Sequence, residues 1–167
     1  MKRVVVYQSS TGFTKQYAEW IAQELSCEAM PLKAVPSGMA DEQDCIIFGG
    51  WVMGNMIMGL DKIRKSNAKK LVVFAVGSSR EEEDIKDALI SQNNLGDKPF
   101  FYMEGGFRFE KLNFIYKTIL KTIKKSLMKK ENKTEREKSM EQMLCTSFDH
   151  SDKKYIAPLI SYVRETE

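Results

Sequence analysis

The chain has 167 residues, 43% of them hydrophobic and 29% charged, and a formal net charge of +3. This length is typical of one compact domain, which buries roughly 70% of its unfolded surface and needs no disulfide or metal to fold. No apolar stretch reaches the roughly 18 residues of a membrane span, and the first apolar run lacks the features of a signal peptide. We therefore expect a cytoplasmic protein.

Cysteine and histidine usage argues against metal sites and disulfides. Cys27, Cys45 and Cys145 are far apart and form no CxxC pair, as expected for reduced cytosolic thiols. His150 is the only histidine, which excludes histidine-rich metal sites and histidine-dependent hydrolytic triads. We therefore predict no bound metal.

Short apolar runs alternate with helical patterns along the chain, and this alternation is typical of parallel βαβ units. Because the apolar runs are continuous, the strands are expected to be buried on both faces, with helices covering each side of the sheet. The sequence thus indicates an α/β fold with a five-stranded parallel sheet. The predicted strands are residues 4–7, 45–48, 71–76 and 100–103, with a weaker candidate at 28–32.

The last third of the chain exceeds what a minimal five-strand unit requires. Residues 153–165 supply the closing helix, which Pro158 should start or kink. Residues 106–148 are therefore interpreted as a helical insertion between the last strand and the last helix. We treat residues 1–167 as a single domain that carries this insertion.

The loop after the first strand has the composition of a phosphate site. Ser9, Ser10, Thr11 and Thr14 supply hydroxyl groups, and Gly12 lets the backbone pass close to a bound group. A helix that begins near Phe13 directs its N–H groups and its positive dipole end at the same point, which suits a phosphate dianion. The alternative is that the hydroxyl groups only cap this helix.

The run Ser9-Ser10-Thr11-Gly12-Phe13-Thr14 resembles the phosphate loop of the flavodoxin family, Ser/Thr-x-Thr-Gly-x-Thr, without departure. The resemblance extends over about two-thirds of the chain. It is closest to the flavodoxin-domain group that includes menaquinone-dependent protoporphyrinogen oxidase, which also carries a long basic, aromatic-rich insertion after the last strand. The resemblance implies FMN as cofactor, a flavodoxin-like three-layer sandwich with sheet order 2-1-3-4-5, and redox chemistry.

Three families with related topologies lack their motifs in this chain. A low-molecular-weight phosphatase requires C-x5-R, but the sixth residues after the cysteines are Lys33, Trp51 and Ser151. A response-regulator receiver requires an aspartate at the end of the third strand, where this chain has Gly49-Gly50. The phosphate-loop motif of nucleoside triphosphatases, GxxxxGK followed by Ser or Thr, is absent.

The resemblance implies that two further strand ends surround the flavin. In Trp51-Val52-Met53-Gly54-Asn55, the tryptophan would stack on the ring and Gly54 and Asn55 would offer backbone groups to its polar edge; core packing of Trp51 is the alternative. In Gly77-Ser78-Ser79-Arg80, the arginine would stabilise the anionic reduced ring and suit two-electron chemistry. A solvated Arg80 is the alternative, and no catalytic residue is predicted.

Residues 111–130 predict a basic amphipathic helix without a single acidic residue. Such a helix can lie on an anionic membrane, dock an acidic redox partner or cover its own core. We favour core cover for the apolar stripe, and the lysine face is left for a partner; no surface suited to nucleic acid is evident. The stripe is Leu112, Ile115, Ile119, Leu120, Ile123 and Leu127, and the basic residues are Lys111, Lys117, Lys121, Lys124, Lys125, Lys129 and Lys130.

Two functional classes fit these observations. The first is an FMN-dependent oxidoreductase acting on a quinone-linked or otherwise hydrophobic substrate. The second is an electron carrier that shuttles electrons between protein partners and has no substrate of its own. Typical carriers are acidic, whereas this chain is mildly basic, so we favour the enzyme. A flavin-free binding module is disfavoured by the intact phosphate loop.

Overall fold

The computed structural model describes residues 2–65, 68–144 and 146–166. The chain divides into two compact units. The sheet unit comprises Met1–Gly105 and His150–Glu167, and the insertion unit comprises Gly106–Asp149. The insertion unit corresponds to the segment of about 106–148 that the sequence sets apart.

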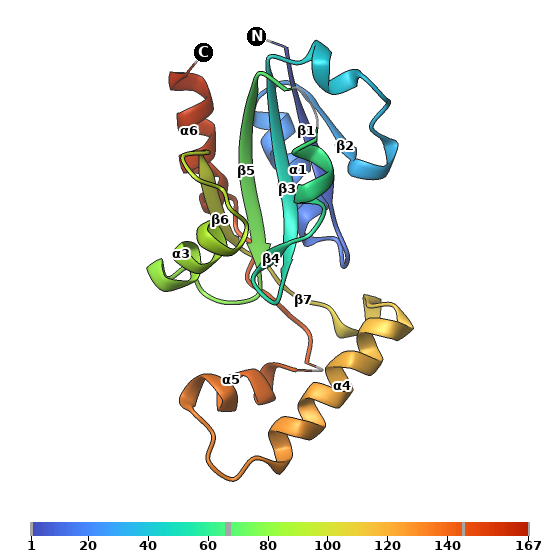
Figure 1. The fold of residues 1–167 in the computed structure, drawn as a ribbon, viewed down its shortest axis with the longest axis vertical. Helices are drawn as coiled ribbons and strands as arrows, with labels where there is room; N and C mark the ends of the chain where they lie inside the picture. The colour runs from blue at the N-terminus through green and yellow to red at the C-terminus, as the bar shows by residue number, and fades with distance from the viewer. Residues whose placement is uncertain (1, 66–67, 145, 167) are drawn as a thin grey trace. The chain divides into compact units, whose positions relative to one another are not determined.

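A parallel sheet of five strands forms the centre of the sheet unit (Figure 1). The strand order is β2-β1-β3-β5-β6, which confirms the predicted order 2-1-3-4-5 for the parallel strands taken along the chain. A sixth, short strand, β4 (Met56–Ile57), pairs antiparallel with the end of β3. The parallel strands are β1 (Arg3–Gln8), β2 (Glu28–Pro31), β3 (Cys45–Met53), β5 (Lys70–Gly77) and β6 (Phe100–Glu104).

Helices cover both faces of this sheet, so the predicted three-layer arrangement is confirmed. On one face, α1 (Phe13–Glu24) and α6 (Ala157–Glu165) pack against alternate side chains of the strands. On the other face, α2 (Leu60–Ile63) and α3 (Glu83–Gln92) do the same. Short 3₁₀ turns complete the unit: η1 (Leu32–Ala34), η2 (Met39–Glu42) and η4 (Lys153–Ile156).

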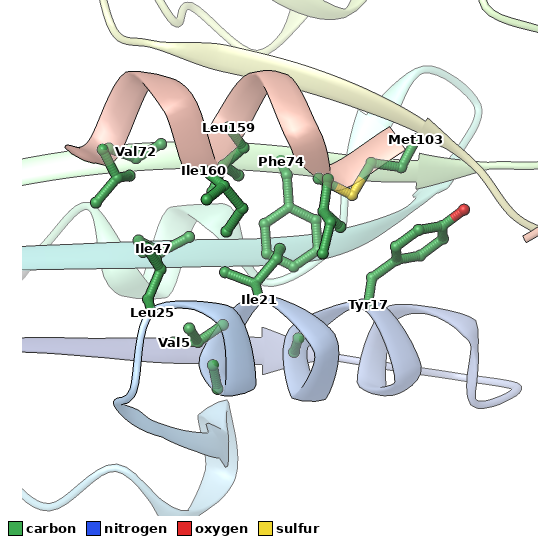
Figure 2. Close-up of a cluster of buried hydrophobic side chains, with 14 of the residues drawn as sticks. Val5, Tyr17, Ile21, Leu25, Ile47, Val72, Phe74, Met103, Leu159 and Ile160 are labelled. Carbon is green, nitrogen blue, oxygen red and sulfur yellow. The ribbon is translucent and has the colours of Figure 1, made fainter. Parts of the chain in front are cut away.

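The continuous apolar strands divide their side chains between two cores, because successive residues of a strand point to opposite faces. On β1, Val5 points towards α1 and α6, whereas Val4 and Val6 belong to the opposite core. Figure 2 shows the first core, in which Ile21 of α1 and Leu159 of α6 meet the side chains of the central strands. Double burial therefore explains why these strands contain no polar alternation.

Pro158 marks the start of the last helix, as its position predicts. It lies in the first turn of α6, where its missing N–H breaks no helical hydrogen bond. Leu159, Ile160 and Val163 of the same helix are buried against the sheet. The predicted closing helix is therefore present, and it is made of η4 and α6 in succession.

The insertion unit contains two helices and a short antiparallel pair of strands. The strands β7 (Gly106–Phe107) and β8 (Phe148–Asp149) pair with each other, and a 3₁₀ turn, η3 (Phe109–Lys111), follows β7. Asn113 caps α4 (Phe114–Lys129) by accepting a hydrogen bond from the Tyr116 N–H. Thr134 and Glu137 form a capping box at the start of α5 (Glu135–Met143).

The apolar stripe of α4 is not the core-covering face that we predicted. No residue of α4 is buried, and Ile115, Ile119 and Ile123 are 67%, 46% and 39% exposed. Leu112, just before the helix, is the one member of the stripe that is buried. The neighbouring helix α5 is predominantly polar, so the insertion unit has too few apolar side chains to cover the whole stripe.

Two neighbouring strands pack tightly where Gly49 of β3 lies beside Phe74 of β5. A Cβ atom at position 49 would lie 2.0 Å from the Cζ atom of the Phe74 ring, and two further ring carbons would lie within 2.5 Å. Phe74 is fully buried between the sheet and its helices (Figure 2), so its ring has little space to move away. Glycine is therefore required here by steric contact.

We expect Gly49→Ala to lower the free energy of unfolding by about 1–3 kcal/mol, the usual cost of overpacking a core. Urea unfolding followed by circular dichroism would measure the change. Ser91→Ala, at an exposed position of α3, is the control and should stay within about 0.5 kcal/mol of the wild type. Equal stability of the Gly49 variant and the control would contradict the steric argument.

Candidate functional site

The carboxyl ends of the parallel strands meet at one edge of the sheet, where ligands of open α/β sheets bind. The registers pair Gln8 with Gly50, Trp51 with Val76 and Gly77 with Glu104, so the loops that follow β1, β3 and β5 are neighbours. In the sheet, β2 lies on one side of β1, and β3, β5 and β6 follow one another on the other side of β1. The strand order therefore reverses beside β1, between the first and second predicted loops.

The loop after β1 leads directly into α1 through a left-handed glycine. Gly12 is the N-cap of α1, with φ 102°, a conformation that L side chains rarely adopt. Its N–H donates to Ser9 Oγ (3.2 Å), and its carbonyl accepts from the N–H of Gln16 (3.0 Å). Gly12 itself has no side chain that could cap α1, and the first turn of the helix contains no acid.

The six residues of this loop differ in burial. Ser10 is exposed, and Ser9, Thr11 and Gly12 are partly exposed. Phe13 packs into the core beside Tyr17, so only its backbone is placed to face a ligand. Thr14 is 1% exposed, which makes it one of two buried polar residues among those described. The structure thus leaves the first four residues accessible at the edge of the sheet.

The second predicted loop is an extension of the sheet. β3 continues through Trp51 and Val52 to Met53, and the chain returns through a two-residue turn into β4. Gly54 and Asn55 both have positive φ, 55° and 62°, as required by the tight turns that match the twist of a hairpin. Of the five predicted residues here, only Gly54 and Asn55 form the turn. Met53 and Met56 stand opposite each other and are exposed.

Asn93, which the sequence analysis did not select, anchors this hairpin to α3. The side chain is 3% exposed and uses both polar atoms: Oδ1 accepts from the Ile57 N–H (2.8 Å), and Nδ2 donates to the carbonyls of Asn55 (2.8 Å) and Leu89 (2.9 Å). The backbone carbonyl of Asn93 also accepts from the Arg64 guanidinium. These hydrogen bonds attach the hairpin to the end of α3.

The third predicted loop is held by two side chains from the end of β6. The Tyr102 hydroxyl donates to the carbonyl of Ser79 (2.8 Å), and a Glu104 carboxylate oxygen accepts from the Glu81 N–H (2.9 Å). A Cβ atom at Gly77 would lie 2.2 Å from the Tyr102 hydroxyl, so this glycine is required for the contact. Ser78, Ser79 and Arg80 are exposed.

The family model described as the flavodoxin domain matches residues 4–135. The chain belongs to the flavodoxin domain family. Family membership indicates FMN as the cofactor, in agreement with the prediction from the phosphate loop. No curated protein sequence matches the chain.

Solved structures with a similar fold include several flavodoxins. A flavodoxin from the domain Archaea is 18% identical, with 62% of this chain and 83% of that chain covered and a TM-score of 0.45. A WrbA-like flavodoxin from Agrobacterium tumefaciens is 21% identical, over 57% and 71% of the two chains, with a TM-score of 0.46. Two-electron reduced Megasphaera elsdenii flavodoxin is 16% identical, over 60% and 82%, with a TM-score of 0.44.

The edge of this flavodoxin domain also carries a group of ionisable side chains that sequence reasoning missed. Burial is the main cause that raises the pKa of Tyr102 far above its usual range. Burial, and then a hydrogen bond with Glu104, raise the pKa of Tyr155 to about 12. Both phenols are therefore neutral at pH 7, and both interact with the side chain of Glu104 beside the third loop.

Tyr17 closes the sheet unit at the point where the chain leaves for the insertion and returns. Its fully buried side chain donates to the carbonyl of Glu104 and accepts from the N–H of Asp152. Next to it, the N–H of His150 donates to the carbonyl of Gly105 (2.8 Å). The segments before and after the insertion are thus joined within the sheet unit itself. Trp20 packs edge-on against Tyr17.

Among the described residues, no group of three or more metal-ligating side chains occurs. Cys27 and Cys45 are free thiols whose pKa values are raised by burial, as expected of unreactive cysteines. Cys145 lies outside the described residues. In the described ranges, no helix is both long and apolar enough to cross a bilayer.

We expect Asn93→Leu to destabilise the protein by about 1–3 kcal/mol, because it removes the partner of the buried Ile57 N–H and of the partly buried Asn55 carbonyl. Amide hydrogen exchange should show the Ile57 N–H losing protection more than amides in β1 do. Gln92→Leu, at the exposed neighbouring position, is the matched control. Unchanged protection of Ile57 in the Asn93 variant would show that other contacts hold the hairpin.

Proposed function

We propose that this flavodoxin domain holds one FMN at the carboxyl edge of the sheet and acts as an FMN-dependent oxidoreductase on a quinone-linked or other hydrophobic substrate. Within the family, we assign it to the group that includes menaquinone-dependent protoporphyrinogen oxidase. The observation that carries the proposal is the start of α1, which follows a loop of hydroxyl residues, begins at the left-handed Gly12 and has no acid in its first turn.

The phosphate of FMN would be held by Ser9–Thr14 through three kinds of interaction. Hydroxyl groups of Ser9, Ser10 and Thr11 lie at an accessible edge and can donate to phosphate oxygens. The helix dipole of α1 favours a dianion at its N-terminus. The left-handed conformation at Gly12 turns the chain into the helix, so that a backbone N–H group and side chains converge on one small volume.

The hairpin and the third loop would flank the isoalloxazine ring. Trp51 lies on β3 at the level of Val76, just before the hairpin whose exposed Met53 and Met56 offer apolar surface. Because Asn93 fixes this hairpin from α3, its surface is preorganised for a flat ring rather than formed on binding. The backbone of Gly54 and Asn55 remains placed at the tip, where it can meet the polar edge of the ring.

Charges on the third loop would set the redox behaviour of the site. Bound FMN supplies the ability to accept and donate electrons as pairs or singly. Arg80 is exposed and, in the described parts of the chain, has no ion pair, whereas the Glu104 carboxylate is engaged by the Glu81 N–H. A cation that is not neutralised by a neighbour stabilises negative charge on a reduced ring, and this favours an enzyme that transfers two electrons.

The second candidate function is that of an electron carrier between protein partners. The mild positive charge of the chain disfavours it relative to the acidic carriers, and the exposed methionines of the hairpin fit contact with a hydrophobic substrate. A carrier would require a protein partner for every oxidation. Oxidation of the reduced protein by menadione, a small soluble quinone, in the absence of any other protein therefore separates the two functions.

We expect the purified protein to bind one FMN per chain, and FAD more weakly, because the loop encloses a terminal phosphate. Thr11→Ala should weaken FMN binding by about 1–3 kcal/mol, the value of a hydrogen bond to a charged group. Gly12→Val should weaken it further, because a branched side chain is strained at positive φ. Quenching of flavin fluorescence measures the affinity. No FMN affinity in the micromolar range, or full affinity in both variants, would refute this site.

We expect Arg80→Glu to lower the potential of the second electron transferred to the bound flavin by tens of millivolts, in order of magnitude, since attraction is replaced by repulsion. A spectroelectrochemical titration of the flavin would measure this shift. Lys98→Glu makes the same charge change at an exposed position before β6, at the opposite edge of the sheet, and should leave the potential nearly unchanged. Equal potentials in wild type and the Arg80 variant would mean that Arg80 only contacts solvent.

A further inference from the structure

The exposed side of α4 consists of three parallel rows of side chains, each with a spacing of four residues. Residues spaced by four form one row along a helix. The isoleucine row is Ile115, Ile119 and Ile123; the hydroxyl row is Thr118, Thr122 and Ser126; and the lysine row is Lys121, Lys125 and Lys129. All nine residues are exposed. The hydroxyl row lies between the other two, because each residue adds about 100° around the helix axis.

The three rows make one continuous surface that is apolar on one side and cationic on the other. The hydroxyls of Thr118 and Thr122 donate to the carbonyls of Phe114 and Thr118 within the helix (both 2.9 Å), so their hydrogen-bonding capacity is partly satisfied within the helix. Phe114, at the start of the helix, is 82% exposed and lies on the lysine side, so it does not extend the isoleucine row. Such an extended apolar surface next to cations is unusual for a face that meets only water.

The opposite side of α4 uses its lysines inside the insertion unit. Lys117 donates to the carbonyl of Glu110 (2.8 Å), and Lys124 donates to the carbonyl of Leu144 (3.1 Å). Lys130, just after the helix, pairs with Glu137 (2.6 Å). In contrast, Lys121, Lys125 and Lys129 form no ion pair with any described residue. The three cations of the lysine row are thus left for an external anion.

We infer that α4 docks on an anionic lipid surface, with the isoleucine row inserted among the acyl chains and the lysine row at the phosphate groups. A helix of this length spans roughly 24 Å and lies flat, with its apolar side about 5–10 Å deep. Lysine side chains extend along the apolar surface and keep their ammonium groups at the headgroups. An acidic protein would contact the lysine row alone. Such a partner would not explain the three exposed isoleucines beside this row.

Vesicle flotation with the full-length protein tests this inference. The wild type should float with phosphatidylcholine vesicles that contain about 30% phosphatidylglycerol, and not with phosphatidylcholine alone. Exchange of the lysine row for glutamine should weaken binding roughly 100-fold, at about fivefold for each lysine. Ile119→Gln with Ile123→Gln should weaken it at least tenfold, with an unchanged thermal melt. Lys33, Lys62 and Lys98, all exposed in the sheet unit, give the matched glutamine control, which should bind as wild type does.

Four results would overturn the inference. The first would be failure of the wild type to float with anionic vesicles. The second would be a control that loses as much affinity as the lysine-row variant does. The third would be a clearly lower melting temperature of the isoleucine variant, which would mean that the row covers a core. The fourth would be equal retention of the wild type and the isoleucine variant on immobilised poly-glutamate while vesicles bind neither. This result would indicate an acidic protein partner. Binding is measured with and without added FMN, so the result does not depend on the proposed flavin site.

Discussion

Burial of the central strands on both faces is the constraint on which the rest of this structure depends. Val5 and Val6 of β1 are fully buried on opposite sides of the sheet, and Ile46 and Ile47 of β3 repeat the arrangement. Helices that cover both faces leave the sheet no accessible surface except its edges. In a parallel sheet, the carboxyl edge collects the loops that follow the strands, so a ligand site can be varied there without any change in the cores.

The second and third loops at this edge are held by polar side chains of neighbouring elements. Asn93 of the α3 terminus holds the hairpin after β3, and Tyr102 and Glu104 of β6 hold the loop after β5. These anchors are buried or partly buried, so a change in them disturbs packing and loop position together. Stability and the positions of these two loops are therefore coupled at this edge.

Much of the fold could be predicted because the strands are recognisable in the sequence as continuous apolar runs and because Pro158 marks a helix start. The phosphate loop could be predicted because hydroxyls, glycine and a helix N-terminus act over six consecutive residues. The anchors could not, because Asn93 acts on residues 36 and 38 positions away, and such contacts leave no local pattern. The hairpin could not be predicted, because Gly54 and Asn55 suit a tight turn and a ligand contact equally well.

The stripe of α4 shows a different limit of sequence reasoning. The spacing of Ile115, Ile119 and Ile123 correctly predicts one apolar side of a helix. Periodicity cannot tell what that side meets, because water, lipid and protein interior all produce the same pattern. The structure supplies what was missing: Leu120 and Leu127 are partly buried, whereas the isoleucines are exposed. The sequence therefore predicts the amphipathic pattern of α4 correctly, but it does not predict that the isoleucines are exposed.

The hydrogen bond between the His150 N–H and the Gly105 carbonyl has a consequence for how this chain can diverge. This bond joins the residue before the insertion unit to the residue after it. Tyr17 of α1 forms hydrogen bonds with both segments at the same junction. The entropy of closing a loop grows only with the logarithm of its length, by about 0.6 kcal/mol for each doubling. Segments of very different size can therefore be exchanged at this junction at little thermodynamic cost, which makes the insertion a replaceable module on a constant scaffold.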